Sequence, residues 1–237
     1  MGKRKVLVTG AAGNIGSRVT QTLSERYELV LLDRDPRDRP GVVQADLRGY
    51  DPRWVRHFDQ VDTVIHLAAN PHTDARWEEL IPDNIDSLLH VCGACVKKKV
   101  RRLVFASSCQ TMEGYRKKGM DKITAKMEPL PANDYGISKV IGERICRHHS
   151  DRFSLSAICL RIGWVPRHGL TKKEAVLSWK RGKWLSDRDL AQVLTRAVEA
   201  EEIRFGIFFA VSDNRGMPWD LAPARKVLGY RPRDGLR

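Results

Sequence analysis

The sequence predicts an α/β fold, a doubly wound parallel sheet of about seven strands with helices on both faces. Short apolar runs rich in Val, Ile and Leu alternate with longer amphipathic stretches, as expected of parallel strands buried on both sides. Near the N-terminus one such run leads into a turn with three glycines. The chain has 237 residues and no repeat or linker, so we expect residues 1–237 to form a single domain.

The turn after the first run has the composition of a phosphate-binding loop. A pyrophosphate is bound by backbone N–H groups at a helix N-terminus, where side chains would block its approach. Gly10, Gly13 and Gly16 permit the bend, the contact with phosphate and close packing of helix on strand. With Asn14 and Ile15 between them, they predict the dinucleotide site of a Rossmann fold.

The second apolar run, residues 28–33, ends in a carboxylate, Asp33. A carboxylate at this position can accept hydrogen bonds from ribose hydroxyls and would repel a 2′-phosphate, so it favours NAD over NADP. Arg34, Arg37 and Arg39 keep NADP open as the alternative, because each could bind a 2′-phosphate.

The other strands and helices follow from the same alternation. Apolar runs predict strands at 5–9, 28–33, 42–44, 63–67, 102–107, 154–161 and 206–211. Amphipathic stretches predict helices at 15–26, 84–98, 134–149 and 187–200. Ligands of doubly wound sheets bind at the carboxyl ends of the strands, so Gly10, Asp33, Ala68 and Ser108 should gather there.

A second motif, Tyr135-Gly-Ile-Ser-Lys139, lies on one of these helices, and its tyrosine and lysine share a helix face. Free tyrosine has a pKa of about 10, too high for a base at neutral pH, but a nearby ammonium favours the phenolate. The strand ending at Ser107 and Ser108 brings a hydroxyl to the same place, where it can bind a substrate oxygen. We expect Ser108, Tyr135 and Lys139 to be catalytic.

Composition limits the partners. The net charge is +13, and basic residues cluster at 97–102 and 116–118. Neither cluster has the interleaved aromatic residues of a nucleic-acid module, so we expect no specific nucleic acid. No apolar run is long enough to span a membrane. Five cysteines and no apolar N-terminal segment favour a reducing cytoplasm. Cys92 and Cys95 lack a second pair, so no metal site is expected.

Together these motifs resemble the short-chain dehydrogenase/reductase superfamily, in its NAD-dependent epimerase/dehydratase (extended) branch, with the uronate dehydrogenases as the nearest likeness. The resemblance is carried by residues 9–16, 46–47, 64–69, 105–108, 135–139 and 160–163. It implies that Asp46 and Leu47 flank the adenine. Leu67, Ala68 and Ala69 would line the nicotinamide side, and Asn84 would start a helix and support Lys139.

For the substrate, the resemblance implies contacts from the strand ends at Ser107, Ser108, Cys109 and Trp164. Segments 162–186 and 212–237 would cover the site, and the helices at 84–98 and 134–149 would form a homodimer. Segment 167–188 carries Lys172, Lys173, Lys180, Arg181 and Lys183. These cations suit an anionic sugar, with Arg181 as the predicted contact; a solvated helix face is the alternative.

The leading hypothesis is an NAD-dependent oxidoreductase that moves a hydride between a sugar or sugar-acid hydroxyl carbon and nicotinamide, with Tyr135 as the base. An epimerase or dehydratase that reoxidises a tightly bound cofactor is the second. A nonenzymatic NAD(P) sensor is the third, although it would need only the glycines.

Overall fold

The computed structural model describes residues 2–167 and 181–237, and their seven-stranded parallel sheet confirms the predicted fold class. The strand order is β3-β2-β1-β4-β5-β6-β7. The strands are β1 (Lys5–Thr9), β2 (Glu28–Asp33), β3 (Val42–Gln44), β4 (Thr63–His66), β5 (Arg102–Ser108), β6 (Ser156–Ile162) and β7 (Phe205–Ala210).

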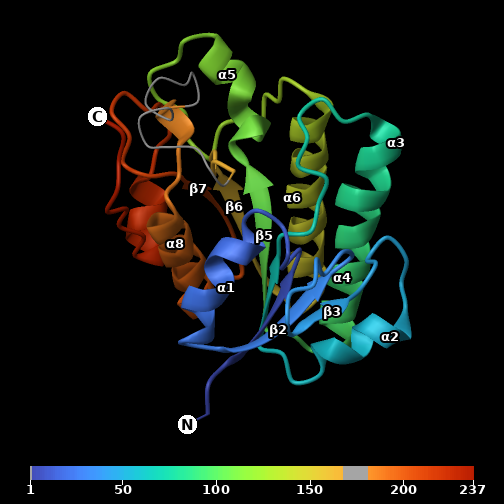
Figure 1. Ribbon diagram of the computed structural model, residues 1–237. Coiled ribbons are helices and arrows are strands. Elements are labelled where there is room, and N and C mark those ends of the chain that lie inside the picture. Colours follow the sequence, from blue (N-terminus) through green and yellow to red (C-terminus); the bar gives the residue numbers. More distant parts are fainter. Residues whose placement is uncertain (1, 168–180) are drawn as a thin grey trace.

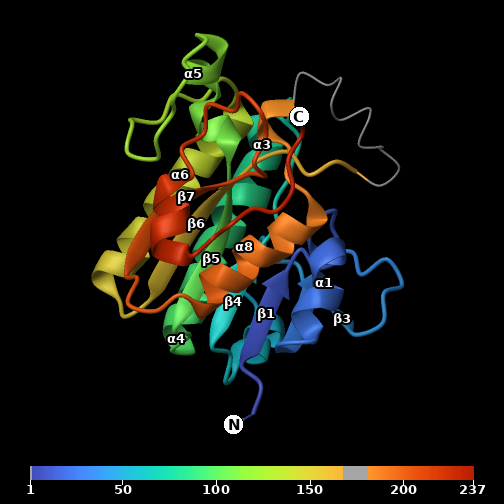
Figure 2. The same ribbon diagram turned by 90° about the vertical axis from the view of Figure 1, so that its left-hand side faces the viewer.

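Helices cover both faces of the sheet. The α-helices are α1 (Gly16–Ser24), α2 (Pro52–Val55), α3 (Trp77–Leu80), α4 (Ser87–Lys97), α5 (Glu113–Lys117), α6 (Asp134–Arg152) and α8 (Asp187–Glu199). Short 3₁₀ helices are η1 (Arg56–Phe58), η3 (Cys109–Met112) and η4 (Arg181–Lys183), and π-helical turns are η2 (Ile81–Asp86) and η5 (Ala224–Leu228). Figure 1 shows α1 and α8 on one side of the sheet, with α4 and α6 on the other. Figure 2 views the sheet from the side of α1 and α8.

Strand alternation divides the core into two apolar layers. In β1, Val6 and Val8 pack with α1 and α8, whereas Leu7 packs with the layer under α2 and α4. All three side chains are fully buried. A strand that is apolar on both faces needs helices on both faces, which is why a nearly continuous apolar run predicted this architecture.

The chain reverses its winding direction between β1 and β4, since β2 and β3 lie on one side of β1 and β4 to β7 on the other. At such a switch point the loops after the two strands diverge and leave a crevice at their carboxyl ends. The loop after β1 begins at Gly10, and the loop after β4 begins at Leu67. The topology therefore places the predicted cofactor residues at the mouth of this crevice.

Two additional pairings extend the sheet at its carboxyl edge. Trp164 forms a parallel bridge with Trp184, and Ile123 forms one with Trp219. Farther along, the C-terminal segment turns back on α8, where Asp189 accepts hydrogen bonds from the backbone N–H groups of Arg233 and Asp234. Of the predicted covering segment 212–237, the first part thus joins the carboxyl edge and the last part packs on α8.

Helix α6 lies close against β5 at Gly142. A Cβ atom on Gly142 would be 2.5 Å from Cζ of Phe105, a buried ring, whereas one on Gly93 in α4 would have only Tyr50 Cε2 nearby, at 3.9 Å.

We therefore expect Gly142→Ala to lower the free energy of unfolding by about 1–3 kcal/mol through overpacking. The matched control, Gly93→Ala, should raise it by up to about 1 kcal/mol, because alanine is the better helix former. Urea denaturation of both variants tests this, and equal effects in both would contradict the close packing of α6.

Candidate active site

The predicted dinucleotide loop joins β1 to α1 and touches the loop after β4. Gly10 has a φ of +67°, and a Cβ there would be 2.6 Å from the backbone nitrogen of Ala68. Only glycine fits this position without strain. Thr9 Oγ1 accepts a hydrogen bond from the Ala68 N–H and lies 2.8 Å from His66 Nδ1. Burial, with a smaller effect of Lys139, lowers the pKa of His66 to about 3, so this imidazole is neutral.

Asp33 anchors the same loop. Its carboxylate accepts hydrogen bonds from the backbone N–H groups of Ala12, at 2.8 Å, and Asp35, at 3.0 Å. Asp46 is exposed and forms a bidentate pair with Arg48, so this predicted adenine contact is bound to a neighbouring cation. Near them lies a hollow of about 410 Å³ lined by residues that include Arg34, Arg48 and Asp83.

Ser108, Tyr135 and Lys139 come together at the carboxyl end of β5. Ser108 caps η3, and its hydroxyl accepts a hydrogen bond from the Gln110 N–H. The first turn of α6 packs on η3 through Gly136, where a Cβ would be 2.7 Å from Gln110 O. Lys139 Nζ lies 5.6 Å from the ring centre of Tyr135 and 5.1 Å from that of Phe105.

Burial sets the proton affinities in this cluster. It raises the pKa of Tyr135 to about 12, and a hydrogen bond with Ser108 opposes part of the increase. Burial also lowers the pKa of Lys139 to about 8, because the charged ammonium loses its hydration. The phenol is thus a weak acid in the protein alone, and Lys139 titrates close to neutral pH.

Asn84 differs from its prediction. It does not start a helix but lies within the π-helical turn η2, where its side chain is buried. Its Nδ2 donates to Ser138 Oγ at 3.0 Å, and its Oδ1 accepts from the Asn70 N–H at 2.7 Å. Asn84 therefore connects the loop after β4 to the residue beside Lys139, and support of Lys139 itself stays a prediction.

Two predicted substrate residues have side chains engaged within the core. Ser107 donates a 2.6 Å hydrogen bond to Glu143 Oε1, and Cys109 donates to the Arg161 carbonyl. Burial also raises the pKa of the Cys109 thiol to about 12. Both side chains thus have partners within the protein, and their contacts with a substrate stay a prediction.

A buried ion pair that the sequence reasoning missed holds α6 on the sheet. Arg161 donates two 2.8 Å hydrogen bonds to the Glu143 carboxylate, and both side chains are at most 4 % exposed. A second missed pair, Lys183 Nζ with Glu113 Oε2 at 3.1 Å, is equally buried and links η4 to α5. Helical spacing offered one signal, since Glu143 lies four residues after Lys139 on the same helix face.

The remaining predicted substrate residues lie at the rim. Trp164 is partly buried, and its backbone pairs with Lys183 and Leu185. Arg181 begins η4, and its side chain is exposed. Lys172, Lys173 and Lys180 lie outside the described residues. Within residues 2–167 and 181–237 there is no cluster of three metal-ligating side chains, and none of the helices found there could span a membrane.

A glycine loop at the switch point and a Ser-Tyr-Lys cluster beside it define an enzyme of the nucleotide-dependent dehydrogenase and epimerase class. The chain belongs to the NAD dependent epimerase/dehydratase family, whose sequence model matches residues 6–202. This confirms the resemblance found in the sequence, and NAD is the cofactor of the family. The residues present fit a dinucleotide, because the glycine loop leads directly into the N-terminus of α1, where backbone N–H groups can bind a pyrophosphate.

Characterised relatives cover nearly the whole chain. An L-arabinose 1-dehydrogenase (NAD(P)(+)) of Haloferax volcanii is 31% identical, with 97% of this chain and 96% of the relative aligned. An NAD-dependent glucose-6-phosphate dehydrogenase of the same organism is 32% identical over 97% of this chain and 93% of its own length. The crystal structure of uronate dehydrogenase from Agrobacterium tumefaciens superposes with a TM-score of 0.85 at 27% identity, covering 100% of this chain and 86% of that one.

Proposed function

We propose that this protein is an NAD-dependent dehydrogenase that acts on a hydroxyl carbon of a sugar or sugar acid, with Tyr135 as the base. The observation that carries the proposal is the meeting of Ser108, Tyr135 and Lys139 beside the dinucleotide loop. The named relatives, which act on a pentose, a hexose phosphate and a uronate, support the substrate class.

Each side chain of the cluster has one task in this proposal. The Ser108 hydroxyl binds the substrate oxygen, and Tyr135 removes its proton. Lys139 favours the phenolate through its charge and binds the nicotinamide ribose. Bound NAD supplies the hydride acceptor. The backbone and side chains proposed to hold it belong to Gly10, Gly13, Asn14, Ile15, Gly16, Asp33, Asp46, Leu47, Leu67, Ala68, Ala69 and Asn84.

The epimerase or dehydratase alternative differs in its products. A dehydrogenase releases NADH in proportion to substrate, whereas an epimerase reoxidises its cofactor within one turnover. The L-arabinose and glucose-6-phosphate dehydrogenases align over at least 93% of their own length, which favours net oxidation. Family membership among enzymes leaves the sensor hypothesis without support.

The decisive experiment measures NADH formation with NAD and a panel of L-arabinose, glucose 6-phosphate, glucuronate and a nucleotide sugar. We expect one of the first three to give NADH, and Tyr135→Phe to lower kcat/KM about 10³-fold because the base is lost. With the wild-type protein, kcat/KM should increase with pH up to about pH 8 as the phenol ionises. Above that pH it should level off, because the loss of the Lys139 proton offsets the further ionisation of Tyr135. Epimerised nucleotide sugar without NADH would replace the proposal by its alternative.

We also propose Arg181 and Trp164 as substrate contacts at the rim. Arg181→Ala should raise the KM for anionic sugars roughly tenfold, because an exposed guanidinium contributes one partly solvated ion pair. The KM for neutral L-arabinose should stay unchanged and serves as the internal control. An equal increase for both kinds of sugar would remove Arg181 as an anion contact.

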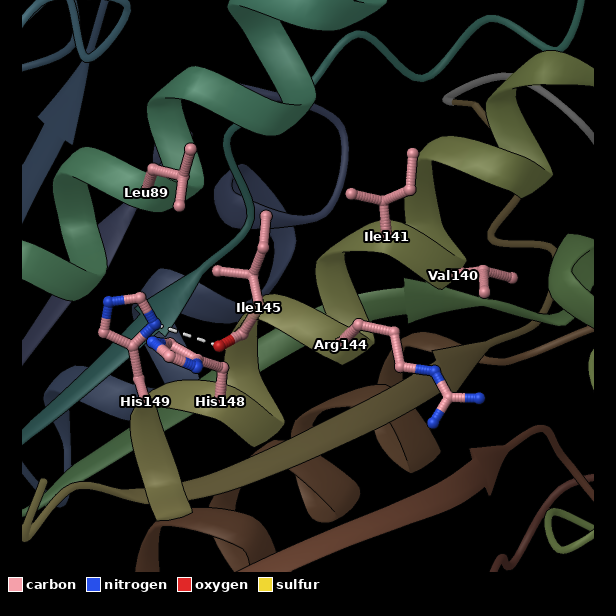
Figure 3. A pocket seen from close by; sticks show the side chains of 7 residues that line it. All are labelled: Leu89, Val140, Ile141, Arg144, Ile145, His148 and His149. Atoms are coloured by element: carbon pink, nitrogen blue, oxygen red, sulfur yellow. Dashed lines mark hydrogen bonds between the residues drawn. The ribbon is translucent and has the colours of Figure 1, made fainter. Parts of the chain in front are cut away.

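The protein is further proposed to be a homodimer through α4 and α6. These helices present an apolar groove of about 360 Å³ lined by Leu89 of α4 and by α6 residues that include Ile141 and Ile145 (Figure 3). His148 and Arg144 lie at its edges. Two copies of a two-helix face related by a two-fold axis would bury it in a four-helix bundle.

Leu89 is 42% exposed, and Leu89→Glu would place a charge in this interface. We expect this variant to be a monomer by sedimentation at a concentration where the wild-type protein is a dimer. Val227, which is 49% exposed on η5, gives the matched control Val227→Glu, which should remain a dimer. A monomeric wild-type protein at high concentration would contradict this interface.

A further inference from the structure

Arg18, on the first turn of α1, contacts segments that lie far from it in the sequence. Its Nη1 binds both oxygens of Asp187, at 2.7 and 2.8 Å, and its Nη2 donates a hydrogen bond to the Pro166 carbonyl at 2.6 Å. Its Nε donates to Asn14 Oδ1 at 3.3 Å. The Arg18 side chain is only 9% exposed although it lies at a helix surface. One guanidinium thus joins three separate parts of the chain.

Two of these parts, residues 163–166 and 184–187, adjoin Trp164, a proposed substrate contact, and are here named the substrate wall. The first follows β6 directly, and the Trp164–Trp184 bridge joins the two halves. Pro166 lies in one half and Asp187 in the other, so Arg18 holds both.

The third part is the dinucleotide loop. Asn14 belongs to it, and besides accepting from Arg18 it donates a 3.2 Å hydrogen bond to the Val165 carbonyl. A pyrophosphate at the N-terminus of α1 would fix the backbone around Asn14. Fixing it would also fix the Asn14 side chain and Arg18, and with them the carbonyl groups of Val165 and Pro166.

We propose that Arg18 is a positioning residue that couples cofactor binding to the order of the substrate wall. Cofactor binding at the loop restrains the wall through Asn14 and Arg18. Because the wall is then ordered before the sugar binds, sugar binding costs less conformational entropy of the protein. This inference rests on the proposed function for the identity of the second ligand. Its first consequence, ordering of the wall by NAD alone, does not depend on which sugar binds.

Hydrogen exchange measured by mass spectrometry, with and without saturating NAD, tests the coupling without any turnover. In the wild-type protein we expect NAD to slow exchange in peptides of the wall roughly tenfold, the size of a typical coupling between sites. In Arg18→Gln this protection should be lost, while protection of the loop at residues 10–16 persists. Asp187→Asn removes the charge of the partner without altering α1 and should lose most of the wall protection too.

The matched control is Arg188→Gln. Arg188 lies in the first turn of α8, as Arg18 lies in the first turn of α1, and it makes a bidentate pair with the Asp234 carboxylate. None of its hydrogen bonds in the described part of the chain reaches the dinucleotide loop. It should keep the NAD-dependent protection. With a sugar that the wild-type protein oxidises, Arg18→Gln should raise the KM with little change in kcat.

The inference is wrong if NAD leaves the exchange of the wild-type wall unchanged, or if Arg188→Gln loses protection as fully as Arg18→Gln. Intact wall protection in both Arg18→Gln and Asp187→Asn would also overturn it. The contacts of Arg18 with Asp187 and Pro166 would then have a purely structural role. Failure of the proposed function gives a different result, in which no sugar of the panel yields NADH. The hydrogen exchange of the wall peptides with and without NAD still tests the coupling in that case.

Discussion

The position of the proposed catalytic residues on α6 depends on the buried ion pair between Glu143 and Arg161. Tyr135, Lys139 and Glu143 follow at intervals of four residues, so they lie along one face of α6. The two parallel hydrogen bonds from Arg161 fix the rotation and height of this face over β5 and β6. Ser107 adds a third hydrogen bond to the same carboxylate. A small rotation of α6 would break these bonds and leave charges buried and unpaired, which is costly.

This pair specifies geometry more than it stabilises the fold. Within the described part of the chain, Arg161 Nη1 is buried and has no hydrogen-bond partner. Two charges taken out of water recover little net energy even when they are well paired, and an unsatisfied donor reduces the gain further. An apolar pair of similar size could hold α6 on the sheet with equal strength, but it would allow α6 to shift more easily over β5 and β6. The ion pair therefore serves the placement of Tyr135 and Lys139.

Much of the fold could be predicted because fully buried parallel strands leave a clear signal. All seven strands occur where apolar runs predicted them, with ends shifted by at most two residues. The short helices α2, α3 and α5 were missed because four or five residues carry no measurable periodicity. The π-helical turn at Asn84 was missed for a similar reason, since an extra residue in a helix changes the spacing but not the composition.

The site was predicted where its residues are close in sequence and missed where they are not. Gly10–Gly16 and Tyr135–Lys139 are local motifs, whereas Arg18 with Asp187 and Glu143 with Arg161 meet only through the fold. Ser107 shows a different limit. Successive residues of a strand point to opposite faces, and the Ser107 hydroxyl binds Glu143 of α6, a neighbour that no local motif indicated. Its contact with a substrate stays a prediction.

The proton affinities imply that the proposed base is incomplete in the protein alone. With a pKa of about 12, Tyr135 ionises at neutral pH only if the phenolate gains on the order of 7 kcal/mol over the phenol. The hydrogen bond with Ser108 already lowers the pKa of Tyr135 in the protein alone, so it supplies none of this further gain. A positively charged nicotinamide beside the ring is a source of stabilisation that the protein alone lacks. Burial lowers the pKa of Lys139 to about 8, so this neighbouring ammonium loses part of its charge in mildly alkaline solution. In the proposed mechanism, ionisation of Tyr135 then depends on the bound cofactor. The phenolate would therefore form mainly in the complex with oxidised NAD, which is the complex that can accept a hydride.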